Sequence, residues 1–214
     1  YIGYRYYETA HKAVRYPFGY GLSYTTFAYS DLKVNADNVT FTITNTGSVD
    51  GAEIAQLYVA KPDAEIFRPA KELKGFAKVF LKAGESKTVT ILLDDKAFRY
   101  WNVQTNWWEA EGGSYQILIG ANVQDIRLTG QIKVQGTGVP DPYAGKKLAH
   151  YRTATIQNVP DDEFEALLGH PVPEEKTVID RTMTLGELNH SRSPLCWLIA
   201  GVLSLLLKEG EKKG

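Results

Sequence analysis

The stretch Val39-Thr40-Phe41-Thr42-Ile43-Thr44 alternates apolar and hydroxyl side chains, and it runs directly into the turn cluster Asn45-Thr46-Gly47-Ser48-Val49-Asp50-Gly51. Successive side chains of a β-strand point to opposite faces, so this period of two predicts a strand with one buried face and one wet face. The asparagine, aspartate and glycines that follow predict a reversal of the chain. Together the two segments favour antiparallel β-structure.

Short apolar runs separated by turn residues continue on both sides of this stretch, from Phe27 to about Val134. A turn signal about every ten residues is typical of an all-β antiparallel sandwich. We therefore predict seven main strands and a short eighth in an immunoglobulin-like or fibronectin type III-like fold. The seven longer runs are 27–34, 39–44, 53–60, 71–81, 86–93, 115–119 and 125–134, and two short runs, 98–101 and 107–110, lie between the fifth and the sixth of them.

Two contrasting segments precede the sandwich. Tyr1-Ile2-Gly3-Tyr4-Arg5-Tyr6-Tyr7 is rich in β-forming side chains and is predicted to be the end of a strand, followed by a loop. Tyr16-Pro17-Phe18-Gly19-Tyr20-Gly21-Leu22-Ser23-Tyr24-Thr25 combines a proline, two glycines and three tyrosines, so its backbone should turn sharply beneath large amphipathic rings. We interpret this second segment as a joint between domains.

The composition changes at Gly136-Thr137-Gly138-Val139-Pro140-Asp141-Pro142, which indicates a linker over residues 136–158. Helical signals begin after it and predict a helical C-terminal extension over residues 159–214. Acidic residues open a short helix over 160–168, which should stop at Gly169. Thr184-Leu185-Gly186-Glu187 fits a capping box, and Ser193-Pro194 is expected to start a helix over 195–208.

The last of these helices is apolar around most of its circumference between Leu195 and Leu207. This run of about 13 residues falls short of the roughly 20 needed to cross a bilayer, so no membrane span is predicted. An interfacial membrane helix would usually carry a basic polar face, which is missing here. We expect the helix to dock on a domain outside this chain or to mediate self-association with a second copy.

The overall charge excludes one class of partner. Lys and Arg total 24 against 25 Asp and Glu, so a net charge of -1 provides no basic surface for nucleic acid. The single cysteine, Cys196, permits no disulfide within the chain and slightly favours a cytoplasmic location, and residues 1–7 lack a signal-peptide pattern. The compartment stays open.

The sequence offers little catalytic chemistry. The four histidines, at positions 11, 150, 170 and 190, have no metal-ligand spacing, so neither a metal site nor a cofactor is predicted. Cys196 lies in the apolar helix, where a buried side chain is its ordinary role. The acidic pairs Asp94-Asp95 and Asp161-Asp162 fall in turn and helix-start positions, where aspartate favours capping. No residue of the chain is predicted to be catalytic.

Four aromatic residues between Tyr100 and Trp108 form the remaining candidate site. Flat indole faces can pack against the apolar faces of sugar rings, so Trp101 and Trp107 are candidate ligand-binding residues. Trp108 is expected in the sandwich core. Trp101 and Trp107 are expected either to be exposed or to pack on a neighbouring domain.

Three motifs in sequence order carry a family resemblance. They are Gly3-Tyr4-Arg5-Tyr6-Tyr7-Glu8, then 17–25, and then Lys71-Glu72-Leu73-Lys74-Gly75-Phe76 with 79–85. In this order they resemble the C-terminal part of a family 3 glycoside hydrolase of the β-glucosidase type. The resemblance covers residues 1 to about 135. It implies that residues 1–26 are the end of an α/β sandwich domain with its connector, and that residues 27–135 are a fibronectin type III-like domain.

The resemblance also implies where the chemistry lies. In this family a barrel domain supplies the aspartate nucleophile and an α/β sandwich domain usually supplies the glutamic acid/base, and both precede the tyrosine-rich segment seen here at Gly3 to Tyr7. Neither motif occurs in this chain, so both domains would be missing partners. The tail also resembles the helical extension of some bacterial members in which the barrel follows the sandwich domains, so the barrel could lie upstream or downstream.

Three functional hypotheses follow. In the first, this chain is the non-catalytic accessory region of a retaining exo-acting β-glucosidase that hydrolyses terminal non-reducing β-D-glucosyl residues in carbohydrate metabolism. The second is a carbohydrate-binding or adhesion module that holds a β-glucoside or oligosaccharide on exposed tryptophans. The third is a purely structural brace whose tail mediates assembly.

Overall fold

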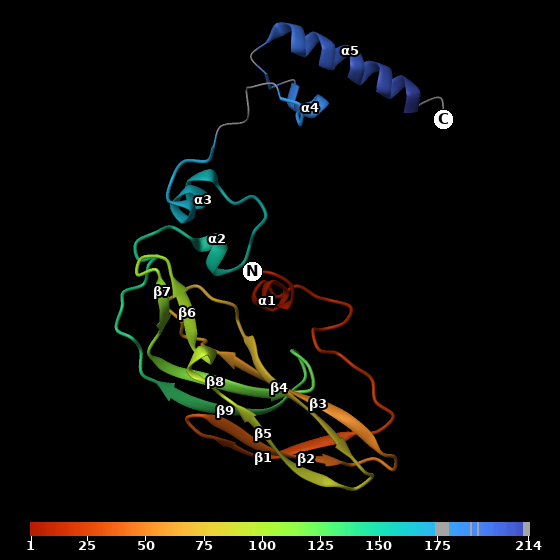
Figure 1. Ribbon diagram of the computed structural model, residues 1–214, viewed down its shortest axis with the longest axis vertical. Helices are drawn as coiled ribbons and strands as arrows, with labels where there is room; N and C mark the ends of the chain where they lie inside the picture. Colours follow the sequence, from red (N-terminus) through yellow and green to blue (C-terminus); the bar gives the residue numbers. More distant parts are fainter. Residues whose placement is uncertain (174–179, 189, 192, 212–214) are drawn as a thin grey trace. The chain divides into compact units, whose positions relative to one another are not determined.

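The computed structural model describes residues 1–173, 180–188, 190–191 and 193–211 (Figure 1). By its internal contacts the chain divides into two compact units, Tyr1–Leu167 and Leu168–Gly214. All the strands that the structure describes lie in the first unit.

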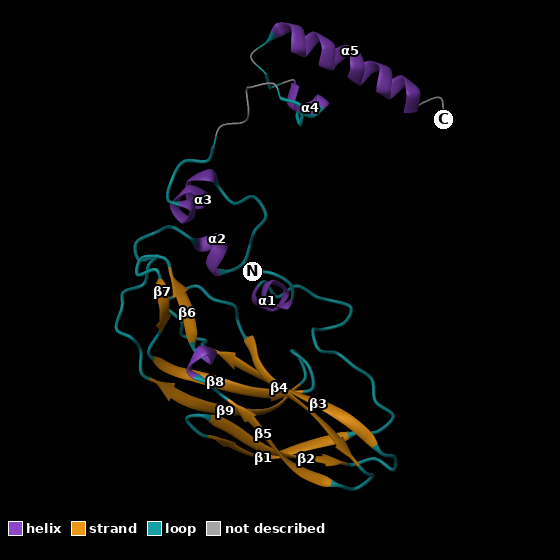
Figure 2. Cartoon of the chain, in the orientation of Figure 1, coloured by secondary structure: helices purple, strands orange, loops and turns teal. Residues whose placement is uncertain are grey.

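Seven antiparallel strands of the first unit form the two layers of a sandwich, as predicted (Figure 2). One sheet has the order β1-β2-β5 and the other has the order β4-β3-β8-β9. The strands are β1 (Phe27–Val34), β2 (Asn38–Asn45), β3 (Gly51–Ala60), β4 (Glu72–Leu81), β5 (Ser86–Leu92), β8 (Gly113–Gly120) and β9 (Ile126–Val134).

The alternation in the deciding stretch is confirmed. Val39, Phe41 and Ile43 of β2 are almost completely buried, while the threonines between them are only half-buried. Burying an apolar side chain of this size contributes about 1.5–3 kcal/mol relative to leaving it exposed. These side chains meet the inner faces of the neighbouring strands in one core, together with Leu57, Leu81, Val89, Ile91, Tyr115, Ile117 and Ile119.

A two-stranded hairpin lies outside this sandwich, between β5 and β8 in the sequence. It consists of β6 (Arg99–Asn102) and β7 (Trp107–Ala110), and the short 3-10 helix η1 (Asp95–Ala97) leads into it. The sequence predicted one short eighth strand here, whereas the structure has a separate pair. The difference arises because the turn at 103–106 lets the two short runs bond to each other rather than to a sandwich sheet.

The strand predicted at the N-terminus is wrong, because Tyr4–Thr9 forms the helix α1. Gly3 precedes it at a φ of 59°, a left-handed conformation that glycine adopts without strain. Tyrosine is a frequent strand residue, but that preference depends on context, and here Tyr4 is fixed by packing. Its ring stacks on Phe18 with 4.4 Å between the centroids and meets Tyr58 edge to face.

This N-terminal segment covers the outer face of β3. From Ala55 onward β3 is buried on both faces, instead of alternating as a one-sided strand would. Tyr58 is completely buried and donates a 2.6 Å hydrogen bond to Gln56 Oε1, and Gln56 Nε2 in turn donates to the carbonyl oxygens of Gly19 and Ala121. The sandwich therefore includes the segment before it in its packing.

The segment predicted as a linker contains a short helix. Residues Ala149–Arg152 form α2, and the predicted helix α3 (Asp161–Leu168) follows. Glu163 of α3 is buried and accepts hydrogen bonds from His150, one from the backbone N–H and one at Nδ1. The Glu163 carboxylate accepts hydrogen bonds from donors at the start of α2. The residue that stabilises α2 therefore lies 13 positions after His150 in the sequence, outside the segment that forms the helix.

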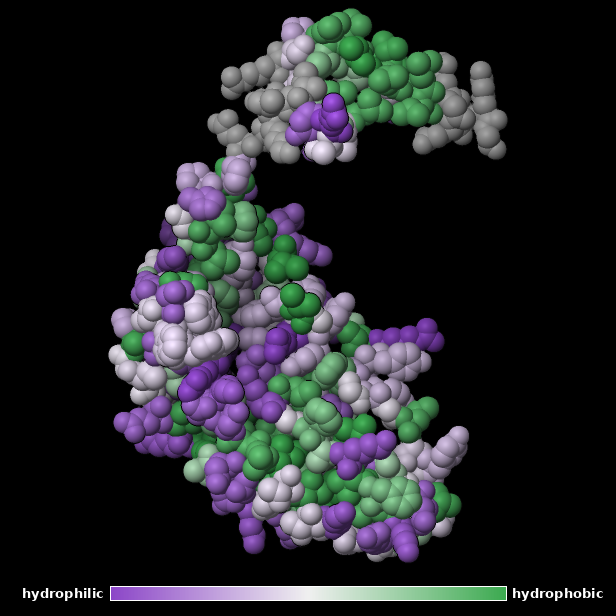
Figure 3. Space-filling model, in the orientation of Figure 1, coloured by the Kyte–Doolittle hydropathy of each residue, from purple (hydrophilic) through white to green (hydrophobic). Residues whose placement is uncertain are grey.

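The second unit contains the remaining predicted helices. Thr184 and Glu187 exchange the reciprocal hydrogen bonds of a capping box at the start of α4 (Leu185–Leu188). The last helix, α5, extends over Pro194–Glu211. Most of its apolar residues are exposed, which Figure 3 shows as a nearly continuous hydrophobic surface. Among the described residues, no helix combines the length and the apolar character that crossing a membrane requires.

Candidate functional site

Helix α1 is attached to the start of β4 by polar contacts. The backbone N–H of Leu73 donates to Tyr4 Oη at 2.8 Å, and that of Ala70 donates to Thr9 Oγ1 at 2.9 Å. Lys71 Nζ lies 3.1 Å from Glu8 Oε2, and Glu8 Oε1 also accepts a hydrogen bond from Gln124. The end of the N-terminal segment is therefore fixed in orientation relative to the sandwich.

The connector that was interpreted as a joint follows α1. Its backbone is held by the sandwich, since the N–H of Val123 donates to the carbonyl oxygen of Phe18 at 3.0 Å. Gly19 has a φ of 80°, and a Cβ there would collide with the side chain of Gln56. Tyr16 and Tyr20 pack on each other across the turn with 5.4 Å between their centroids. Tyr24 is fully exposed, so not every ring of the connector closes over it.

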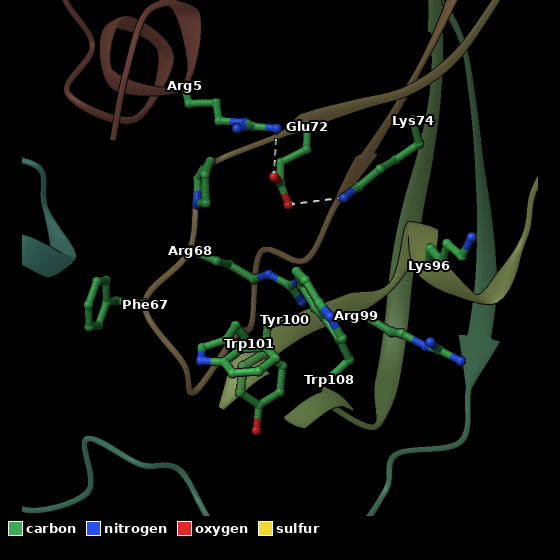
Figure 4. Close-up of a pocket in the computed structure, with 11 residues that line it drawn as sticks. Arg5, Phe67, Arg68, Glu72, Lys74, Lys96, Arg99, Tyr100, Trp101 and Trp108 are labelled. Atoms are coloured by element: carbon green, nitrogen blue, oxygen red, sulfur yellow. Dashed lines mark ion pairs between the residues drawn. The ribbon is translucent and has the colours of Figure 1, made fainter. Parts of the chain in front are cut away.

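A cavity of about 610 Å³ opens beside α1 (Figure 4). It collects side chains from α1, the loop before β4, β4 itself, η1 and the β6–β7 hairpin. Its lining residues are Arg5, Phe67, Arg68, Pro69, Glu72, Lys74, Lys96, Arg99, Tyr100, Trp101 and Trp108. We call this space the Trp101 cavity.

Trp101 and Trp108 form the aromatic wall of the Trp101 cavity. They are directly opposite each other in the β6–β7 register, so both lie on one face of the hairpin. Their rings meet edge to face with 5.4 Å between centroids, and they are 42% and 50% exposed. The prediction that Trp108 lies in the sandwich core is wrong, because its strand belongs to the hairpin and not to either sheet of the sandwich.

Trp107 lies on the other face of the hairpin, opposite Asn102. It is 67% exposed and does not line the Trp101 cavity. The structure therefore brings Trp101 together with Trp108 and separates it from Trp107.

The charged wall of the Trp101 cavity is mainly cationic. Arg5 and Lys74 share one carboxylate, Glu72, at 3.3 and 3.4 Å. Lys96 has no ion pair within the described part of the chain. Arg68 and Arg99 bring the lining cations to five, against one lining carboxylate. Arg99 pairs with Asp95 and Arg68 lies near Glu111, neither of which lines the cavity. Sequence inspection missed this excess because the five side chains come from five different elements of the fold.

Arg68 is the most buried of the lining cations. Its side chain is 11% exposed, and Nη1 donates to Tyr115 Oη at 3.1 Å and lies 3.9 Å from Glu111 Oε2. Burial raises the pKa of Tyr115, so its phenol stays protonated and donates in turn to the carbonyl oxygen of Glu111. Tyr115 therefore orients the guanidinium without cancelling its charge.

The paired carboxylates occupy the structural positions that the sequence indicated. Asp94 and Asp95 are exposed at the start of η1, and Asp161 and Asp162 lie in the first turn of α3. In the part of the chain that the structure describes, no group of three or more His, Cys, Asp or Glu side chains could hold a metal ion. Cys196 lies in α5 and is partly buried.

Residues 53–123 match the family described as fibronectin type III-like domain. The exo-alpha-(1->6)-L-arabinopyranosidase of Bifidobacterium breve is 50% identical over 147 residues, which cover 66% of this chain and 19% of that protein. Thermostable beta-glucosidase B of Acetivibrio thermocellus is 46% identical over 145 residues, covering 64% and 19%. The solved GH3 beta-glucosidase of Bifidobacterium adolescentis superimposes with a TM-score of 0.62 at 38% identity, over 92% of this chain and 24% of that one.

This chain contains a fibronectin type III-like domain and resembles the C-terminal part of family 3 glycoside hydrolases. The expected sandwich and the family resemblance are both confirmed. The chain spans about a quarter or less of the length of these relatives. The relatives are thus larger proteins that contain domains not present here.

Proposed function

We propose that this chain is the non-catalytic accessory region of an exo-acting family 3 glycosidase, and that the whole enzyme is a β-glucosidase acting on terminal non-reducing β-D-glucosyl residues. The observation that carries the proposal is the superposition of 92% of the chain on a solved GH3 beta-glucosidase of which it covers only 24%. Catalytic carboxylates would then belong to the barrel and α/β domains of that enzyme.

The accessory role has a structural basis in α1. If residues 1–26 are the end of the α/β sandwich domain, the contacts of Tyr4 and Glu8 with residues 71–73 fix that domain on the sandwich. A rigid support of this kind holds catalytic groups in place, since small displacements cost large factors in rate. The sandwich would act on catalysis through position alone.

The sugar specificity of the whole enzyme is part of the proposal. Two relatives are named arabinopyranosidases, and the one from Bifidobacterium longum is 42% identical over 81% of this chain. We favour glucose because the superimposed Bifidobacterium adolescentis structure is a β-glucosidase.

A chimera tests the accessory role. In the Bifidobacterium adolescentis enzyme, the matching fibronectin type III-like region is replaced by residues 27–135 of this chain. We expect the chimera to hydrolyse aryl β-glucosides with the sugar preference of its host. A chimera that unfolds cooperatively but now prefers α-L-arabinopyranosides would show that the sandwich itself sets specificity, and would overturn the proposal.

Helix α5 is proposed to dock on a domain outside this chain, with self-association as the alternative. The exposed apolar residues that need a partner are Leu195, Trp197, Leu198, Ile199, Val202, Leu203, Leu205, Leu206 and Leu207. Light scattering of the chain with and without residues 194–211 separates the two. A dimer that becomes monomeric on truncation would support self-association.

The second candidate function is sugar binding at Trp101, and the Trp101 cavity favours it. An aromatic wall with two half-exposed indoles suits the apolar face of a pyranose ring. Trp107 was an equal candidate in the sequence, but it would have to act alone on the opposite face. Saturable quenching of tryptophan fluorescence by cellotetraose, abolished by Trp101→Ala, tests this role.

A further inference from the structure

We propose that the Trp101 cavity binds a saccharide that carries carboxylates, of the kind found in β-1,4-linked uronic acid oligomers. This inference rests on the proposed sugar-stacking role of Trp101 and adds the chemical class of the sugar. Figure 4 shows the arrangement that leads to it, with the indoles of Trp101 and Trp108 beside Arg68 and below the ion pairs of Glu72.

The size and the aromatic wall of the cavity define the first half of the ligand. A volume of about 610 Å³ is in the range of small-molecule sites, which are typically ~300–1,000 Å³. Trp101 and Trp108 each keep about half of their surface open toward solvent. A flat ring with an apolar face would cover that surface, whereas a bare inorganic anion would leave it exposed.

Arg68 indicates the second part of the ligand, its carboxylate. Nη1 is engaged by Tyr115, but Nε and Nη2 make no hydrogen bond within the described part of the chain. A guanidinium presents its N–H groups as a planar fork that matches the two oxygens of a carboxylate. Because the Arg68 side chain is nine-tenths buried, water screens this charge less than it would screen a surface arginine.

The remaining cations supply an excess of positive charge around that fork. Glu72 neutralises only one of its two partners, Arg5 and Lys74, and the side chains of Glu72 and Lys74 are each less than one-fifth exposed. Lys96 adds a further charge that makes no ion pair within the described part of the chain. Like charges that lie close together repel one another, so an anionic ligand would relieve a repulsion that a neutral sugar leaves in place.

A matched pair of oligosaccharides tests the inference on the 214-residue chain. Tetramers of β-1,4-linked glucuronic acid and of β-1,4-linked glucose share one backbone and differ at C6, where the acid carries a carboxylate. We expect the acidic tetramer to bind about tenfold more tightly than cellotetraose at low salt, because one or two additional charge-assisted hydrogen bonds account for an affinity difference of that size. That preference should shrink as ionic strength rises.

Single substitutions assign the site. Lys96→Gln removes one positive charge from the cavity, so it should weaken binding of the acidic tetramer about threefold and leave binding of the uncharged cellotetraose unchanged. Lys87→Gln, on the exposed face of β5, is the matched control and should change neither. Trp101→Ala should abolish binding of both tetramers, while Trp107→Ala should preserve it.

Arg68→Lys keeps the charge but removes the fork, so the preference for the acid should fall while the folded state is retained. Its circular dichroism spectrum and unfolding midpoint verify that state.

The outcomes distinguish the preference for acidic sugars from the proposed sugar stacking at Trp101 on which it rests. Equal affinity for the two tetramers would overturn the preference for acidic sugars and leave sugar stacking at Trp101 intact. Binding of neither tetramer would overturn both. A tetraglutamate peptide that binds as well as the acidic tetramer would overturn the assignment to saccharides, since it offers carboxylates without a pyranose ring.

Discussion

The hydroxyl of Tyr4 accepts a 2.8 Å hydrogen bond from the backbone N–H of Leu73, a residue 69 positions away. The same side chain stacks on Phe18 and meets Tyr58 edge to face, so it links α1, the connector, β3 and β4. The segment before the sandwich is therefore part of its folded surface. A domain that ends in α1 would be held on the sandwich by this residue.

Tyr4→Phe removes the acceptor and leaves the N–H of Leu73 without its partner, while the ring contacts stay. We expect a loss of about 1 kcal/mol in the free energy of unfolding, measured by urea denaturation. Tyr7→Phe is the control, since Tyr7 is 43% exposed and its hydroxyl makes no hydrogen bond within the described residues. Equal midpoints for the two variants would show that α1 is not fastened through Tyr4.

Gly19→Ala tests the geometry of the connector. The left-handed backbone at Gly19 costs other residues roughly 1–2 kcal/mol, and the added Cβ would also displace Gln56. Gly21→Ala is a matched control two residues away, because Gly21 has no positive φ and a Cβ added there would meet no atom within 4 Å. We expect a lower melting temperature for Gly19→Ala only. A similar decrease in both variants would contradict the proposed close packing.

Asn45 joins Thr25, at the C-terminal end of the connector, to the core of the sandwich. It is completely buried, and its side chain makes four hydrogen bonds, to Thr25, Gly47, Val49 and Leu81. Asn45→Ala leaves these four groups without their hydrogen-bond partner, so it should lower the free energy of unfolding by about 3 kcal/mol. Asn35→Ala, at an exposed turn, should change stability by less than about 0.5 kcal/mol. A small effect at Asn45 would mean that water replaces its hydrogen bonds.

Glu163 should make stability depend on pH. Burial raises the pKa of its carboxyl, but hydrogen bonds from the His150 ring and from the backbone N–H groups of His150 and Tyr151 outweigh burial and hold the pKa below its usual range. The carboxylate therefore stabilises the fold above about pH 4.3, the unfolded value, and this contribution is lost as pH falls toward the folded value.

Comparison with Glu163→Gln isolates that contribution. At pH 7 the variant should unfold at lower urea than the parent chain, and the two midpoints should converge as the pH falls below about 4.3, the unfolded value. A difference that stays constant over this range would mean that the charge of Glu163 is not what holds α2 to α3.

The sandwich could be predicted because its signals are local. Val39, Phe41 and Ile43 lie at the period of a strand, and turn residues follow them directly. The capping box at Thr184 and Glu187 is local in the same sense, since the two residues bond to each other. In both cases the residues that determine the structure lie within a few positions of it.

The features that sequence inspection missed depend on distant partners. Helix α1 is stabilised by Tyr58 and Leu73, and α2 by a carboxylate 13 residues later. Trp108 was placed in the core from its apolar character, but hairpin pairing sets it beside Trp101 instead. The Trp101 cavity exists only where α1, the loop before β4, β4, η1 and the β6–β7 hairpin meet, so no single stretch of sequence predicts it.

The most direct test of the accessory role is an activity assay of the 214-residue chain itself, using 4-nitrophenyl β-D-glucopyranoside and 4-nitrophenyl α-L-arabinopyranoside. The Bifidobacterium adolescentis β-glucosidase serves as the positive control. If the catalytic carboxylates belong to other domains of the enzyme, the folded chain should release nitrophenol from both substrates no faster than buffer. Saturable turnover of either substrate that persists through repurification would contradict the account.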